Sequence, residues 1–237
     1  AATAFVSMWV SNTSTTLMML PVAVSIAGLV APDHAQADPE RRNFSTAIVL
    51  AVAYSATIGG LATLIGTPTN ALAVAFMEQT YGVRPSFAEW LVFGVPCTVL
   101  MQAGTRWVLV AVSHRFHLPD ITGARELVRT ELHGLGPMSV PERRVAAVGL
   151  AAAAAWIGSP WLKHLPGLGA LSDMGVAMLA GLALFLLPSG VPGGGTLLHG
   201  QDFRRVPWET LFLFGGGLAL AALIQESGLS GNIGDLL

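Results

Sequence analysis

Most of the chain consists of apolar stretches, and its polar residues gather in short runs between them. Apolar stretches of about 20 residues are typical of helices that cross the ~30 Å hydrocarbon layer of a membrane. Beyond residue 30 the pattern predicts a broken helix at 44–79 and helices at 90–113, about 145–162, 171–188 and 208–225. It therefore predicts an all-α polytopic membrane protein.

A run of small polar residues, Ser11-Asn12-Thr13, interrupts the first apolar region between arms at 5–10 and 14–30. Each arm is expected to be too short to cross the membrane alone. Residues 1–30 are therefore predicted to form a re-entrant helical hairpin or a discontinuous helix.

The second interruption lies at 59–69, where glycine, threonine and proline divide the predicted helix at 44–79. Non-helical backbone occurs at membrane depth only where protein buries it or where it lines a water-filled cavity. Two interruptions together are typical of a small-solute or ion site built from helix ends and free carbonyl groups. The pattern thus favours a transporter.

The residues at the two breaks suit an anion and a cation. Ser, Asn and Thr are preferred helix N-caps, and the second hairpin arm would direct its positive end into the protein. The carbonyls that end the first arm, with the hydroxyl of Ser7 on the face of Ser11, are oxygen ligands for a hard cation. Gly59-Gly60 allows close backbone approach and offers further carbonyls. Thr67-Pro68 begins a new helix.

Sodium is the cation that this ligand set favours, because every available ligand is a neutral oxygen. Neither break contains Asp or Glu, which argues against a proton pump that uses a carboxylate relay. Small residues also occur at ordinary transmembrane helix interfaces, where they permit close packing. Two breaks, each with a nearby proline, favour the functional interpretation.

Composition supports the membrane class and narrows the function. The chain is 53% hydrophobic and 11% charged, with a mean hydropathy of +0.62, whereas soluble domains carry about 25% charged residues. The formal net charge of -2 gives no indication of a nucleic-acid partner. Cys97 is the single cysteine, and no Ser/His/Asp or Cys/His set shares a plausible site. The protein is therefore not expected to be an enzyme.

Arginines indicate the orientation in the membrane. They concentrate in the polar segments 31–43, 114–144 and 189–206, whereas the opposite loops contain only Arg84 and Lys163 as basic residues. Under the positive-inside rule the arginine-rich segments are cytoplasmic. Residues 114–144 are accordingly predicted to be a cytoplasmic interfacial linker.

Three motifs resemble the divalent anion/sodium symporter family, which includes dicarboxylate transporters. Residues 8–21 resemble its first Ser-Asn-Thr signature, residues 53–68 resemble its broken fifth helix, and residues 208–217 are similar to its ninth helix. The likeness covers nearly the whole chain. It implies an inverted-repeat fold with two re-entrant hairpins, each with a Ser-Asn-Thr run at its tip.

The resemblance also implies roles for individual residues. Asn12 and Thr13 would bind a substrate carboxylate, and Thr63, Thr67 and Pro68 would support the site. The first sodium site would comprise Ser7, Ser11, Asn12 and the backbone of Gly59 and Gly60.

The division into repeats follows from the same resemblance. Residues 1–113 would be the second half of the first repeat, and 145–237 the first half of the second. The family usually has Pro-Pro-Asn where this chain has Pro68-Thr69-Asn70, and no second Ser-Asn-Thr is present. The chain is therefore expected to be an internal fragment that lacks half of the binding site.

The implied function is sodium-coupled transport of C4-dicarboxylates, such as succinate, malate and fumarate, across the cell inner membrane. A homodimer in the lipid bilayer is implied as well. The alternatives are a sodium-independent anion exchanger, a carrier of sulfate, citrate or arsenite, and a non-transporting membrane subunit.

Overall fold

The computed structural model describes residues 1–30, 38–114, 129–130, 133–134, 136–162, 164 and 172–227. Every regular element in these ranges is helical, apart from one isolated antiparallel bridge between Pro188 and Thr196. The prediction of an all-α protein is confirmed.

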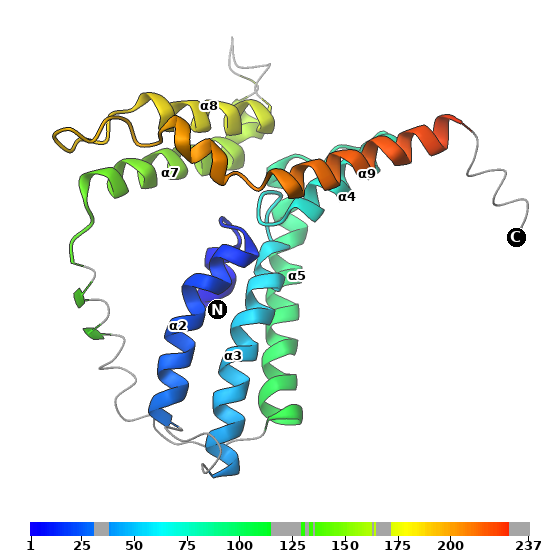
Figure 1. Ribbon diagram of the computed structural model, residues 1–237. Helices are drawn as coiled ribbons and strands as arrows, with labels where there is room; N and C mark the ends of the chain where they lie inside the picture. Colours follow the sequence, from blue (N-terminus) through cyan, green and yellow to red (C-terminus); the bar gives the residue numbers. More distant parts are fainter. Residues whose placement is uncertain are drawn as a thin grey trace, which may run out of the picture.

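Three long helices form an upright bundle (Figure 1). They are α2 (Asn12–Val30), α3 (Pro39–Gly60) and α5 (Phe87–Trp107), which continues into a π-helical turn, Val108–Ser113. The short helix α1 (Ala2–Ser7) and α2 both pack on α3. This arrangement brings the loop between α1 and α2 beside the end of α3, where the two predicted breaks meet.

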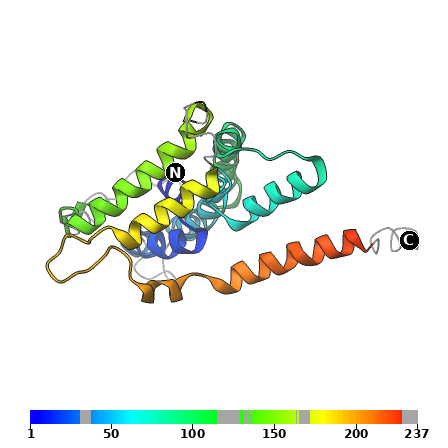
Figure 2. The same ribbon diagram turned by 90° about the horizontal axis from the view of Figure 1, so that it is seen from above.

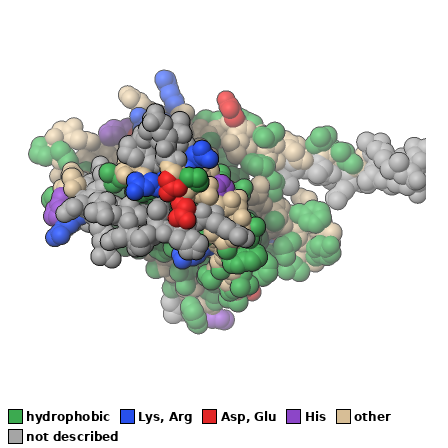
Figure 3. All heavy atoms as spheres, turned by 90° about the horizontal axis from the view of Figure 1, so that it is seen from below, with side chains coloured by type: hydrophobic (Ala, Val, Ile, Leu, Met, Phe, Trp, Pro, Cys, Tyr) green, Lys and Arg blue, Asp and Glu red, His purple; other side chains and the backbone are tan. Residues whose placement is uncertain are grey.

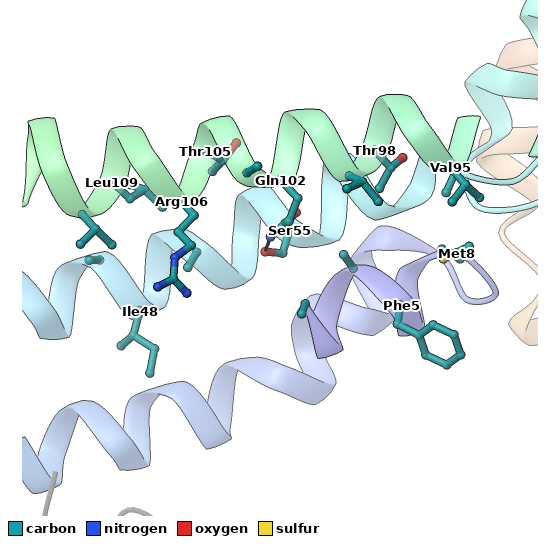
Figure 4. Close-up of a pocket in the computed structure, with 18 of the residues that line it drawn as sticks. Phe5, Met8, Ile48, Ser55, Val95, Thr98, Gln102, Thr105, Arg106 and Leu109 are labelled. Carbon is teal, nitrogen blue, oxygen red and sulfur yellow. Dashed lines mark hydrogen bonds between the residues drawn. The ribbon is translucent and has the colours of Figure 1, made fainter. Parts of the chain in front are cut away.

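The first 30 residues fold as helix, short loop and helix, with the chain reversing at the predicted polar run (Figure 4). The expectation that neither arm is long enough to cross a membrane is wrong for the second. Helix α2 has 19 residues and begins at Asn12, so Asn12 and Thr13 of the polar run lie in its first turn and Ser11 directly precedes it. At 1.5 Å per residue, this length corresponds to about 28 Å.

The predicted broken helix is two helices. Helix α3 ends at Gly60, and α4 (Pro68–Tyr81) follows after the loop 61–67. The expectation that both segments belong to one crossing is not met, because α4 runs crosswise to α3 in both ribbon views (Figures 1 and 2). The loop 61–67 changes the direction of the chain, so α4 does not continue along the axis of α3.

The later helices occupy the predicted regions: α7 (Val140–Leu162), α8 (Asp173–Leu186) and α9 (Trp208–Glu226), with a 3-10 turn, Gly200–Arg205, before α9. Helix α8 has 14 residues, about 21 Å, which is shorter than the full crossing expected at 171–188. Most of the predicted interfacial linker lies outside the described residues, although 140–144 already belong to α7.

A small aromatic core joins the two halves of the described structure. Phe87, at the start of α5, stacks on Trp156 of α7 with ring centroids 5.2 Å apart. The backbone N–H of Phe87 donates to Oδ2 of Asp173 at 2.9 Å, and the Trp156 indole donates to the carbonyl of Asp173. The run Ser11-Asn12-Thr13 forms the polar tip of the hairpin. Trp9, which lies beside this tip, packs against the same core. These contacts connect α7 and α8 to the loop that carries the tip.

Four helices within the described ranges are long and apolar enough to cross a membrane: Asn12–Val30, Pro39–Gly60, Phe87–Ser113 and Val140–Leu162. Their outer faces carry large exposed apolar side chains, such as Val92 and Leu150. In Figure 3, which views the molecule from below, hydrophobic side chains (green) gather toward the right of the picture. Apolar area on this scale needs lipid or protein to cover it. The chain is a multi-pass membrane protein.

Candidate functional site

The polar tip is a capped helix N-terminus. Ser11 is the N-cap of α2: its carbonyl accepts from the N–H of Thr15 at 2.9 Å, and its Oγ accepts from the N–H of Ser14 at 3.3 Å. The Ser11 hydroxyl also donates to Oγ of Ser14. Thr13 is exposed in the first turn. The N–H groups and positive dipole end of this turn favour a negative charge at the tip.

Three oxygens converge just behind the tip. The Oγ of Ser7 lies 2.8 Å from Oδ1 of Asn12 and 2.6 Å from the carbonyl oxygen of Ala56 in α3. Ser7 is fully buried. A serine hydroxyl has one proton, so it can satisfy only one of these two acceptors at a time. Ser7 can therefore donate to Asn12 or to Ala56 but not to both at once, and neutral oxygens of this kind can also coordinate a hard cation.

The two glycines that end α3 permit this approach. A Cβ atom on Gly60 would lie 2.3 Å from Oδ1 of Asn12, and one on Gly59 would lie 2.3 Å from the carbonyl oxygen of Ala4. Both positions are buried, and no side chain larger than a hydrogen fits there without movement. Gly59 and Gly60 therefore let α3 approach α1 and the hairpin tip closely; their role in binding an ion stays a prediction.

The loop after α3 is fastened to the tip. The Thr63 hydroxyl donates to the carbonyl of Met8, the last residue before the turn of the hairpin, and Thr63 is fully buried. Asn70, in the first turn of α4, donates from Nδ2 to the carbonyls of Gly60 at 2.8 Å and Thr63 at 2.7 Å. Thr63 thus contacts the hairpin directly, and its role as a supporting residue of an ion site stays a prediction.

Four of the expected site residues lie outside the oxygen cluster formed by Ser7, Asn12 and Ala56. Ser11 and Thr13 lie on the exposed side of the tip. Thr67 is the extended residue before α4, with its Oγ1 3.2 Å from Oγ1 of Thr69, and Pro68 is the exposed first residue of that helix. Ser7, Asn12, Gly59, Gly60 and Thr63 are brought together.

Sequence reasoning missed two participants. The carbonyl of Ala56 lies one helical turn before Gly60 and becomes a partner of Ser7 only in the folded chain. Asn70 follows Thr67-Pro68-Thr69 and is 3% exposed. A buried polar side chain needs hydrogen-bond partners, so an amide in the first turn of a mostly apolar helix was the signal available.

A separate cavity of about 610 Å³ lies between α1, α3 and α5 (Figure 4). Apolar side chains such as Phe5 and Val99 make up most of its wall, while Gln102 donates to Ser55 across it and the exposed Arg106 lies along it. None of the residues expected to bind sodium or substrate lines this cavity. The oxygen cluster at the tip is therefore the candidate site.

Comparison with known proteins shows the family of the chain. Residues 2–237 match the family described as the sodium:sulfate symporter transmembrane region. The chain belongs to this family. The resemblance to the divalent anion/sodium symporters is thereby confirmed over nearly the whole chain.

Two curated relatives in the family carry the name sodium-dependent dicarboxylate transporter SdcS. The protein from Staphylococcus saprophyticus is 36% identical over 241 residues, and that from Staphylococcus aureus USA300 is 34% identical over 242 residues. Each alignment covers 100% of this chain and 46% of the relative. The chain thus spans about half the length of the curated relatives that it matches.

Proposed function

We propose that the whole protein is a sodium-coupled symporter of C4-dicarboxylates such as succinate, malate and fumarate. The observation that carries the proposal is the buried cluster of neutral oxygens beside a helix N-terminus. The names of the relatives, which are sodium-dependent dicarboxylate transporters, support the same coupling ion and substrate class. The proposed role is transport and not catalysis.

Sodium would bind where Ser7, Asn12 and the ends of the interrupted helices meet. The hydroxyl of Ser7, the amide oxygen of Asn12 and carbonyls near Gly59 and Gly60 would hold it. Ser11, the other expected ligand, lies on the exposed side of the tip and would have to turn inward to reach it. The charge of the ion would attract the lone pairs of the neutral oxygens that hold it. Sodium supplies the positive charge that a dianion needs in a site without Arg or Lys.

The substrate carboxylate would lie on the exposed side of the same turn. There the N-terminus of α2 presents its N–H groups, and the side chains of Asn12 and Thr13 supply further polar contacts. Because Asn12 would contact both ions, sodium binding would raise anion affinity and the anion would raise sodium affinity by the same factor. Each net positive charge that enters would gain about 2.3 kcal/mol per 100 mV of membrane potential.

The arrangement of the whole protein is part of the proposal. Residues 1–113 would end one repeat and 145–237 would begin an inverted second one, joined by the cytoplasmic linker 114–144. Residues 1–30 would enter the membrane from the cytoplasm as a re-entrant hairpin. Transport would involve displacement of the part that carries the hairpin against a scaffold, in a homodimer in the cell inner membrane.

Uptake of labelled succinate by the whole protein in proteoliposomes tests this function. We expect an inward sodium gradient to drive accumulation, and potassium at equal concentration to give none. Uptake that requires internal dicarboxylate and ignores sodium would instead identify an exchanger. Sulfate is the second candidate substrate, because the family description names it; competition by sulfate but not by malate would favour it.

A further inference from the structure

Asn70 occupies an unusual position for an amide side chain. It lies in the first turn of α4, whose sequence is mostly apolar, and it is 3% exposed. Burial of an amide without hydrogen bonds costs free energy. Asn70 avoids this cost by donating from Nδ2 to two backbone carbonyls, at 2.8 Å to Gly60 and 2.7 Å to Thr63.

The two accepting carbonyls lie at the end of α3 and in the loop that follows it: Gly60 is in the helix and Thr63 is in the loop 61–67. The last four carbonyls of an α-helix have no partner within the helix, and Gly60 is the final residue of α3. The carbonyl of Gly60 is buried, so water cannot replace the hydrogen-bond donor that it lacks within the helix. Asn70 thus satisfies the C-terminus of one helix from the first turn of the next.

Gly60 and Thr63, whose carbonyls accept from Asn70, both contact the hairpin tip. The Cα of Gly60 faces the side chain of Asn12 so closely that an added Cβ would lie 2.3 Å from its Oδ1. The Thr63 hydroxyl donates to the carbonyl of Met8. Movement of the Gly60–Thr63 backbone would therefore change the position of Asn12 and of the first-arm carbonyls together.

We infer that Asn70 is a positioning residue of the cation site: it holds the backbone of Gly60 and Thr63 against the hairpin tip at the spacing that sodium requires. The inference rests on the proposed sodium site and adds a residue that would not touch the ion. Groups that orient metal ligands typically change metal affinity by about 10- to 100-fold when they are removed.

Two substitutions separate the lost hydrogen bonds from the lost volume. Asn70→Ala removes the amide and leaves space, whereas Asn70→Leu removes the amide and fills the space. Thr98→Val is the matched control, because the buried Thr98 hydroxyl donates at 3.3 Å to the carbonyl of Ile58, one residue before the glycine pair of α3. The control therefore loses a buried bond to the same helix end without releasing Gly60.

Thermal stabilisation of the purified whole protein by sodium chloride, against choline chloride at equal ionic strength, is the measurement. We expect both Asn70 variants to need about tenfold more sodium for half-maximal stabilisation, with the full stabilisation recovered at high sodium. Thr98→Val should lower the melting temperature without changing the sodium requirement.

An unchanged sodium requirement in either folded Asn70 variant, or an equal shift in Thr98→Val, would overturn the positioning role. Sodium stabilisation of the wild-type protein would then leave the proposed sodium site standing. A wild-type protein that does not respond to sodium would overturn both. Stabilisation by sodium without succinate uptake would refute only the proposed substrate, since the readout does not depend on it.

Discussion

Substitution of Gly60 by alanine is the sharpest perturbation of the candidate site. The added Cβ would lie 2.3 Å from Oδ1 of Asn12, whereas ordinary contact begins near 3.4 Å. The amide oxygen must therefore retreat by about 1.1 Å, the difference between these two distances. It is the end of a side chain, so it can move without unfolding the hairpin.

The displacement predicts a large functional effect and a small effect on stability. Misplacement of a reacting or binding group by about 1 Å can reduce activity about 100-fold, which corresponds to roughly 2.7 kcal/mol. We expect the sodium concentration for half-maximal succinate uptake to rise by about two orders of magnitude in Gly60→Ala. The melting temperature should stay close to that of the wild-type protein.

The assay is the sodium dependence of succinate uptake in proteoliposomes that contain the whole protein, with Gly104→Ala as the control. Gly104 lies in α5, and a Cβ there would meet nothing within 4 Å. Alanine at Gly104 should leave sodium dependence unchanged and stabilise the helix by about 0.5–1 kcal/mol. A wild-type sodium requirement in Gly60→Ala would refute the placement of Asn12 in the cation site.

Substitutions at three further positions test the surrounding contacts. Gly59→Ala should lower the melting temperature markedly in a fluorescence-monitored melt, because its Cβ would lie 2.3–2.8 Å from the backbone of Ala4; a wild-type melting temperature would contradict the packing of α1 on α3. Ser7→Ala should abolish sodium stabilisation, since it removes a cluster oxygen; its persistence in a sodium titration would exclude Ser7 as a ligand. Asp173→Ala should cost about 1–3 kcal/mol in denaturant unfolding by leaving the N–H of Phe87 unpaired, whereas Asp173→Asn keeps an acceptor and should cost less; equal losses would argue against this bond.

The predicted helices and both interruptions follow from patterns that are local in the sequence. Apolar length identified the helical regions, and the small polar run Ser11-Asn12-Thr13 marked the start of α2 because such side chains satisfy free N–H groups wherever a helix begins. The glycine pair marked the end of α3 for an equally local reason. The structure confirms these elements, although α4 turns aside and α8 is shorter than a crossing.

Long-range contacts depended on the fold. Ser7 meets the carbonyl of Ala56 across 49 positions of sequence, and Phe87 meets Asp173 across 86. No periodicity encodes such pairs, because the direction of each helix after its loop decides which backbone groups come together. Asn70 shows the difference most clearly. The sequence shows an amide in a mostly apolar segment, but its burial and its bonds to two carbonyls arise only because the loop 61–67 folds back on α3. The sequence by itself determined the membrane class, the helical regions and the residue types at the two breaks, whereas tertiary structure decided which of their oxygens lie together.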